Sequence, residues 1–138
     1  MLQDILGPDV FFSGLKEFFA KFKYSAARTE NFIAIMERVS GRDLGDFFDG
    51  WFRSWELPAV QTSWSEESTA SGLRLKVRVT QTRGHFVFPL WVEWRSRGET
   101  HREVVVIDRP SQEFDLAVPG KVDRVLFNPL RLVPGKFS

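Results

Sequence analysis

Two histidines and one tyrosine are the side chains of this 138-residue chain best suited to metal binding or proton transfer. His85 falls in a predicted hairpin turn, and His101 opens a predicted strand. Because a zinc site needs at least a third converging ligand, both histidines are expected at the surface. Tyr24 could donate to an oxyanion, but it lies at the predicted end of a helix, where its hydroxyl is expected in water. We therefore assign no catalytic, cofactor-binding or metal residue.

Three aspartates, Asp43, Asp46 and Asp49, recur every three residues and suggest a possible calcium or acid/base site. Calcium takes six to eight oxygen ligands, usually from a loop, and a helical row presents few of them at once. Asp43 is explained more simply by the helix dipole, which favours acidic residues in the first turn. The row is predicted to be the solvated face of a helix.

A basic row, Arg74, Lys76 and Arg78, together with Trp91, suggests a possible nucleic-acid surface on a sheet. Basic residues on a solvated strand face are ordinary, and several glutamates dilute them. The formal net charge is only +1, whereas nucleic-acid binders carry a concentrated basic excess. We predict no nucleic-acid partner.

The aromatic content is the unusual part of the composition, with 14 Phe and five Trp. Aromatic side chains bury about 150–250 Å² each, so the core is expected to be rich in them. The chain has no cysteine, which excludes disulfides and thiolate chemistry but fits both a reducing and an oxidising compartment. No run approaches the 18 or so apolar residues of a membrane helix, so no membrane partner is predicted.

Helical periodicity fills the first third of the chain. Pro8 suits the first turn of a helix over residues 8–23, whose Phe and Leu residues share one broad face. A second helix is predicted over residues 30–40, with Thr29 as N-cap and Gly41 as its end. A third stripe covers residues 44–55, and Pro58 prevents further helix. Trp51 of this stripe is expected to be buried against Phe32, Met36 and the first helix.

The period changes from 3.6 to 2 after Pro58. Apolar and polar residues alternate over residues 73–80 and again over 86–95, which predicts half-buried strands. Further strands are predicted over residues 60–65, 102–107, 113–118 and 125–133, separated by glycine and proline turn signals. Six or seven such strands predict an antiparallel sandwich. Pro89 indicates an edge or bulge position, because proline cannot donate to the ladder.

One set of spacings resembles a known family. The set is Phe32, Ser40-Gly41-Arg42-Asp43-Leu44, Phe47-Phe48, Trp51 and Pro58. It is similar to the "F…SGxDLxxFFxxW…GxP" pattern of zinc aminopeptidases of the aminopeptidase N and leukotriene A4 hydrolase type. One departure is Glu56, which stands where the family usually has glycine.

The resemblance extends in both directions from this set. The opening MLQDILG, with Phe11-Phe12 and Leu15, is similar to the family's "hxMLxxxLGxxxFxxxLxxF" segment, which follows the catalytic Tyr. Downstream, VRVTQ and Phe88-Pro89-Leu90 resemble the "vxQ…fxxPl" strands of a fibronectin-like sandwich found in many members. The resemblance implies a C-terminal piece of a zinc metallopeptidase, without the H-E-x-x-H frame and distal Glu that hold the zinc.

We therefore predict an α+β chain, with a short helical bundle followed by a small antiparallel, fibronectin- or immunoglobulin-like β-sandwich. Residues 1–58 would be the helical end of the peptidase catalytic region, and residues 59–138 the sandwich. No cofactor is expected in this chain, and zinc is expected in the parent. Implied partners are the upstream catalytic domain, a peptide substrate for the parent, and a second copy through exposed helices. The alternative is an independent binding module that recognises protein or glycan through Trp91.

Overall fold

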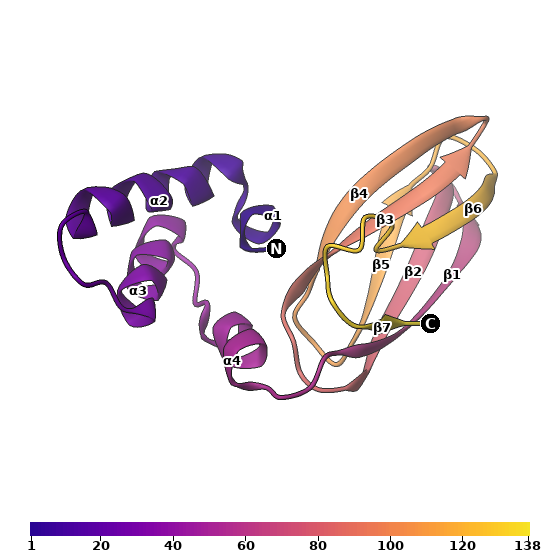
Figure 1. Cartoon of the computed structure of the whole chain (residues 1–138). Helices are drawn as coiled ribbons and strands as arrows, with labels where there is room; N and C mark the ends of the chain where they lie inside the picture. Colours follow the sequence, from indigo (N-terminus) through magenta and orange to yellow (C-terminus); the bar gives the residue numbers. More distant parts are fainter.

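The computed structural model describes all 138 residues and has a helical part followed by a β-sandwich (Figure 1). The two parts lie at opposite ends of the molecule, and the N-terminus lies at the junction between them. This is the predicted α+β architecture. The helices are α1 (Leu2–Leu6), α2 (Pro8–Phe22), α3 (Thr29–Ser40) and α4 (Gly45–Arg53). The strands are β1 (Ala59–Thr69), β2 (Gly72–Arg83), β3 (Phe88–Ser96), β4 (Glu99–Ile107), β5 (Ser111–Ala117), β6 (Val122–Phe127) and β7 (Lys136–Phe137).

The helix boundaries follow the local sequence signals closely. Pro8 opens α2, where its missing N–H would have no partner in any case. Gly41 ends α3 in the left-handed conformation, and its N–H bonds to the carbonyl of Glu37. Thr29 was expected to cap α3 but is its first helical residue, and Arg28 takes the N-cap position. The prediction failed because the Asn31 side chain accepts a bond from the Arg28 amide at 2.9 Å, which moves the start by one residue.

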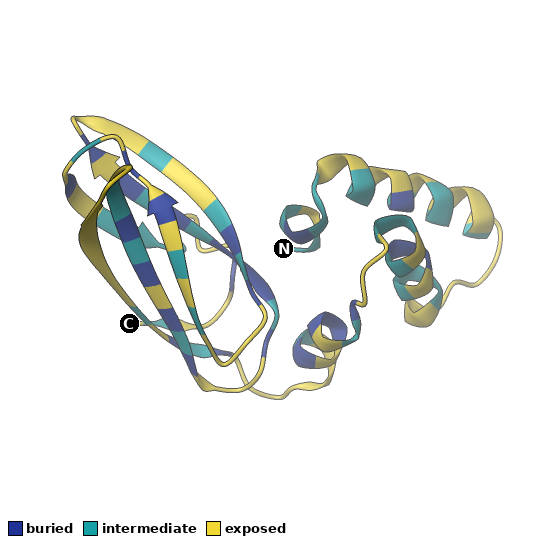
Figure 2. Cartoon of the chain, turned by 180° about the vertical axis from the view of Figure 1, so that it is seen from behind, coloured by how far each residue is buried: buried dark blue, intermediate teal, exposed yellow.

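The helical part has a small aromatic core. Its buried apolar residues are Ile5, Met36, Leu44, Phe47 and Phe48. Figure 2 shows these buried positions on the inner sides of the helices, with the outer sides exposed. Gly14 of α2 lies against Met36, because a Cβ built there would be 2.5 Å from the methionine sulfur. The two helices can therefore approach closely.

The predicted aromatic stripes are wider than the surface available to cover them. Phe12 and Phe19 of α2 are 55% and 62% exposed, and Phe52 of α4 is 68% exposed. Trp55 is fully exposed, because α4 ends at Arg53 and Ser54 is extended. Each helix can turn only one side toward the small helical core, and the rest of the stripe faces solvent.

The seven strands form two sheets with the orders β5-β2-β1-β7 and β4-β3-β6. All pairings are antiparallel except the short parallel contact of β7 with β1. Alternate residues of β2 and β3 fill the space between the sheets, as their period of two predicted. Buried residues from these strands are Leu75, Val77, Val79, Phe88, Leu90, Val92 and Trp94. The prediction for residues 125–133 was too long, because Asn128 has a φ of 51° and turns the chain out of β6.

Strand β3 is the central strand of its sheet, yet Pro89 itself lies at an edge position, as predicted. The pairing with β6 covers only residues 92–96 of β3. Pro89 pairs with Val106 of β4 and has no strand neighbour on its other side. The missing N–H is tolerated because the sheet is two strands wide at that point.

None of the four helices has both the length and the hydrophobicity of a bilayer-spanning segment.

Candidate functional site

The junction between the helices and the sandwich is built around Trp51. Its indole N–H donates a hydrogen bond to the carbonyl oxygen of Val87 at 2.7 Å, and its ring lies 5.0 Å from that of Phe86. Trp51 was expected inside the helical bundle and is instead half-buried between the bundle and the sandwich. The indole has a polar edge, and the unpaired carbonyl in the β2–β3 connection supplies its acceptor. The apolar core between the helices offers no such hydrogen-bond acceptor.

Close backbone approach completes the same contact. A Cβ at Gly50 would lie 3.1 Å from the carbonyl oxygen of His85 and 3.3 Å from the ring of Phe86. Gly50 therefore allows α4 to rest directly on the β2–β3 connection. A glycine inside a helix is unfavourable by about 1 kcal/mol relative to alanine. The close contact with the β2–β3 connection explains why glycine occupies this position.

Gln81 fixes the connection that receives Trp51. It is one of two buried polar residues of the chain. Its side-chain oxygen accepts from the Phe86 amide at 2.9 Å, and its side-chain nitrogen donates to the carbonyls of Phe86 and Arg109 at 2.8 and 3.1 Å. Residues far apart in sequence are therefore held in one hydrogen-bonded group, which positions Phe86 beneath α4.

A second bridge joins the parts near the N-terminus. The indole N–H of Trp91 points to a carboxylate oxygen of Asp4 at 3.4 Å. Trp91 is half-buried and lies against the helical part, whereas the alternative reading required it to be free for a protein or glycan ligand. The independent binding module is therefore not favoured.

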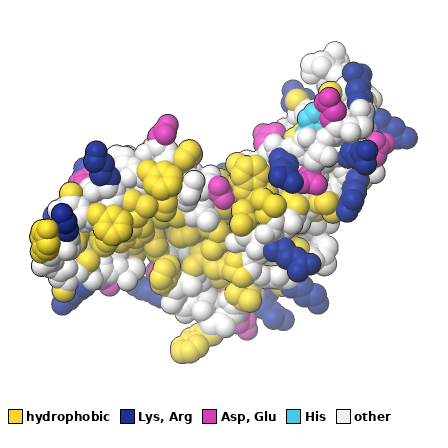
Figure 3. All heavy atoms as spheres, turned by 45° about the horizontal axis from the view of Figure 1, so that its top comes forward, with side chains coloured by type: hydrophobic (Ala, Val, Ile, Leu, Met, Phe, Trp, Pro, Cys, Tyr) yellow, Lys and Arg dark blue, Asp and Glu magenta, His cyan; other side chains and the backbone are white.

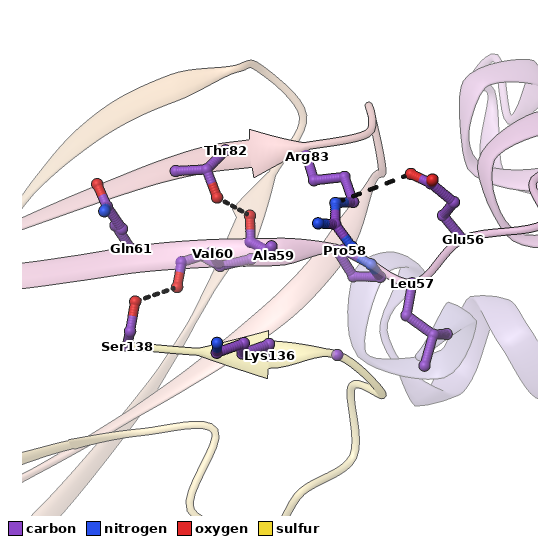
Figure 4. Close-up of a pocket in the computed structure, with 11 residues that line it drawn as sticks. Glu56, Leu57, Pro58, Ala59, Val60, Gln61, Thr82, Arg83, Lys136 and Ser138 are labelled. Atoms are coloured by element: carbon purple, nitrogen blue, oxygen red, sulfur yellow. Dashed lines mark hydrogen bonds and ion pairs between the residues drawn. The ribbon is translucent and has the colours of Figure 1, made fainter.

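A pocket of about 680 Å³ lies where the linker between the two parts enters β1 (Figure 4). Its charged lining residues are Glu56, Arg83 and Lys136, and Glu56 lies 3.9 Å from Arg83. The backbone of Pro58 accepts from Lys136 at its edge. Its lining residues include no cysteine, no histidine and no group of metal ligands.

The residues singled out for chemistry do not come together. Tyr24 is 90% exposed at the end of α2, and His85 is exposed in the β2–β3 connection, both as expected. His101 is a correction: its ring stacks on Trp94 with centroids 5.6 Å apart, and its Nε2 is buried without a hydrogen-bond partner. His101 of β4 lies directly opposite Trp94 of β3. Its ring is therefore on the same face of the sheet as Trp94, toward the sandwich interior. No group of three or more His, Asp or Glu side chains is arranged to hold a metal, so the residues present do not fit a zinc site.

The three aspartates are exposed, as predicted, but only Asp46 and Asp49 lie on α4, whereas Asp43 precedes the helix. Asp43 accepts from the Gly45 amide at 2.8 Å, just before α4, and so acts as a local cap. Asp49 pairs with Arg53 at 3.3 Å, one turn further along. Asp46 lies between them and has no ion-pair partner within 4.0 Å.

The basic row is largely neutralised. Lys76 lies 2.6 Å from Glu67, and Arg78 Nε donates to Glu113 at 2.7 Å. The hydrogen bond and charge of Glu67 raise the pKa of Lys76 above its ordinary value. Trp91 lies on the other sheet, away from this row. No basic surface of the kind that binds nucleic acid is formed by this row.

The helical part exposes the largest apolar surface. Figure 3 shows hydrophobic side chains spread across the helices and toward the junction, whereas the sandwich end carries mixed charges. The exposed aromatic residues of this part are Phe12, Phe19, Tyr24, Phe52 and Trp55. Sequence periodicity identified all of them as stripe or helix-end residues but could not tell which would stay uncovered.

The helical part is similar to a known protein family. Residues 1–51 match the model of the peptidase family M1 domain. Aminopeptidase M1-C of Oryza sativa subsp. japonica is 35% identical over 60 residues, which is 44% of this chain and 7% of the relative. Aminopeptidase A of Gloydius brevicauda is 31% identical over 61 residues, 44% of this chain and 6% of the relative. The chain thus spans only a small part of the length of these relatives.

The fold extends the likeness through the sandwich. Aminopeptidase A of Legionella pneumophila, solved in complex with aspartic acid, matches 100% of this chain and 16% of that chain with a TM-score of 0.82. The sequence identity is 17%, so this comparison concerns the fold alone. Together with the family model and the curated relatives, it confirms the predicted relationship: the chain is related to the peptidase family M1 aminopeptidases.

Proposed function

We propose that this chain is a structural, non-catalytic C-terminal piece of a zinc-dependent aminopeptidase, and that it supports the zinc-binding part of that protein. The parent activity is hydrolysis of N-terminal peptide bonds. We place the border between its two parts at residues 58 and 59. The observation that carries the proposal is that the whole fold of the chain corresponds to 16% of a solved aminopeptidase.

The exposed aromatic surface supports the structural role. Contiguous exposed apolar patches typically mark interfaces, and here Phe12, Phe19 and Tyr24 lie within the residues that match the family model, with Phe52 and Trp55 just beyond them. The other side of the helical part is tied to the sandwich by Trp51, Gly50 and Trp91. A two-part unit with one exposed apolar face is suited to buttress a larger catalytic body.

Two measurements test the proposal. The purified chain, supplied with zinc and then dialysed, is expected to retain no stoichiometric zinc and to hydrolyse no aminoacyl chromogenic substrate, with a complete zinc aminopeptidase assayed in parallel as the control. One zinc per chain together with turnover would overturn it. The second measurement is to determine the sequence encoded upstream of residue 1. We expect H-E-x-x-H followed by a distal Glu there, and an unrelated domain would contradict the proposal.

A further inference from the structure

The pocket at the start of β1 has a cationic side chain on each of two opposite walls. The strand register pairs Ala59 of β1 with Arg83 of β2 on one side and with Lys136 of β7 on the other. All three residues line the pocket, and Figure 4 shows them on three adjacent strands. Neighbouring strands lie about 4.8 Å apart, so the backbones that carry the two cations are about 10 Å apart. A small alanine between two long cationic side chains leaves room for a group that both can reach.

A bulge in the β1–β2 pairing brings Arg83 to this position. Val60 pairs with Gln81, whereas the preceding residue of β1 pairs with Arg83. Thr82 is therefore the extra residue of the bulge, and its hydroxyl donates to the Ala59 carbonyl at 3.1 Å. Bulges re-aim the side chains beside them, and here both Thr82 and Arg83 line the pocket.

The positive charge of this pocket is only weakly balanced. Glu56 is the one acidic side chain among the lining residues, and it lies 3.9 Å from Arg83. The two side chains are 63% and 65% exposed, and exposed ion pairs contribute little. Lys136 has no carboxylate within 4.0 Å, whereas Lys76 and Arg78 of the same sheet each lie close to a glutamate. The pocket therefore has a surplus of positive charge that the chain does not neutralise.

We propose that this pocket binds a small anionic ligand whose phosphate or carboxylate group lies between Arg83 and Lys136, above Ala59. The guanidinium of Arg83 is suited to a bidentate contact with either group, and the ammonium of Lys136 supplies a second charged donor. The ligand replaces Glu56 as the partner of Arg83.

The size of the pocket favours a small molecule over a macromolecule. A volume of about 680 Å³ lies within the range of small-molecule sites, about 300–1,000 Å³. A polyanion such as nucleic acid needs a more extended basic surface than two side chains. The proposal does not rest on the structural role proposed above, because no lining residue lies within residues 1–51, the part that matches the family model.

Titration of the chain with inorganic phosphate and, separately, with citrate tests the proposal, with the ionic strength held constant by sodium chloride. The amide NMR signals of Ala59, Arg83 and Lys136 are expected to shift and to saturate with at least one of the two anions. Saturation by phosphate alone identifies a phosphate as the recognised group, and saturation by citrate alone identifies a carboxylate. Both anions failing to saturate these signals, or shifts spread evenly over the basic residues of the chain, would overturn the proposal.

Charge substitutions separate the pocket from the general surface charge. Arg83→Gln and Lys136→Gln are each expected to weaken binding at least about fivefold, because each removes a charged donor to the anion. Arg124→Gln, at an exposed position on the other sheet, removes the same charge and is the matched control, with no change expected. Glu56→Gln is expected to tighten binding about twofold, because the competing carboxylate is removed.

Ala59→Leu tests the pocket without a change of charge. The larger side chain fills the space between the two cations, so binding is expected to be lost. Ala117→Leu, at an exposed position on β5 at the other edge of the same sheet, is the control and is expected to bind like the unmodified chain. Circular dichroism and thermal unfolding establish that each variant is folded before affinities are compared. Equal affinities for Arg83→Gln and Arg124→Gln, or for the two leucine variants, would overturn the proposal.

Discussion

The indole nitrogen of Trp51 lies 2.7 Å from the carbonyl oxygen of Val87, and this hydrogen bond joins the last helix to the sandwich. The two residues are 36 positions apart, and the ring also packs on Phe86. The two parts of the chain are therefore expected to unfold as one cooperative unit rather than separately.

Replacing Trp51 tests this coupling. Trp51→Phe removes the hydrogen bond to Val87 but keeps an aromatic ring, and is expected to lower the free energy of unfolding by about 1 kcal/mol. Urea unfolding followed by circular dichroism measures it. Trp55→Phe, at a fully exposed position, is the control and is expected to change stability by less than about 0.5 kcal/mol. Equal effects at the two positions would show that the Trp51 contact contributes nothing.

Gly50→Ala is expected to destabilise the chain, although alanine is the better helix former. The added methyl would press on the carbonyl oxygen of His85, a backbone atom that cannot move freely, at a cost of about 1–3 kcal/mol. Gly45→Ala is the control, because the nearest atom to its methyl is the flexible carboxylate tip of Asp43. Thermal unfolding compares them; a stabilised Gly50→Ala protein would show that α4 does not rest on the β2–β3 connection.

Gln81→Met tests the hydrogen bonds that hold Phe86. The substitution keeps the length of the side chain but leaves the buried amide of Phe86 without its acceptor, so a loss of about 1–3 kcal/mol is expected. Gln61→Met, on the exposed side of β1, is expected to be nearly neutral. Chemical denaturation measures both, and similar midpoints for the two variants would exclude a special role for Gln81.

His101→Phe is expected to be neutral or to stabilise the chain by up to about 1 kcal/mol. The ring stacking on Trp94 is kept, while the unpartnered Nε2 atom is removed from the interior. His85→Phe, in an exposed turn, is the comparison and gains nothing by this reasoning. A clear loss of stability in His101→Phe would mean that the imidazole has a partner in solution, such as a bound water.

The sequence by itself determined most of the elements and their order, although the short helix α1 and the two-residue strand β7 were not predicted. Pro8 and Gly41 act on their own backbone and immediate neighbours, so they place helix ends without knowledge of the fold. The end of α4 was not found in this way, because the helix stops at Arg53, before the predicted end at residue 55 and before Pro58. The period of two in β2 and β3 likewise identified the buried face of each strand, because alternation is a property of the extended chain. The relationship to the aminopeptidases was also available, since it depends on the order and spacing of residues.

Only the tertiary structure decided which side chains meet across long distances in the chain. Phe12 and Phe47 both belong to apolar helical stripes, yet one is exposed and the other buried, because coverage depends on neighbouring elements. Trp51 packs on both the helical core and the sandwich core, since its N–H finds its acceptor, the Val87 carbonyl, in the β2–β3 connection. Local patterns specify which face of an element is apolar, whereas packing determines what covers that face. We expect the apolar surface that stays uncovered to be where this protein contacts its partners.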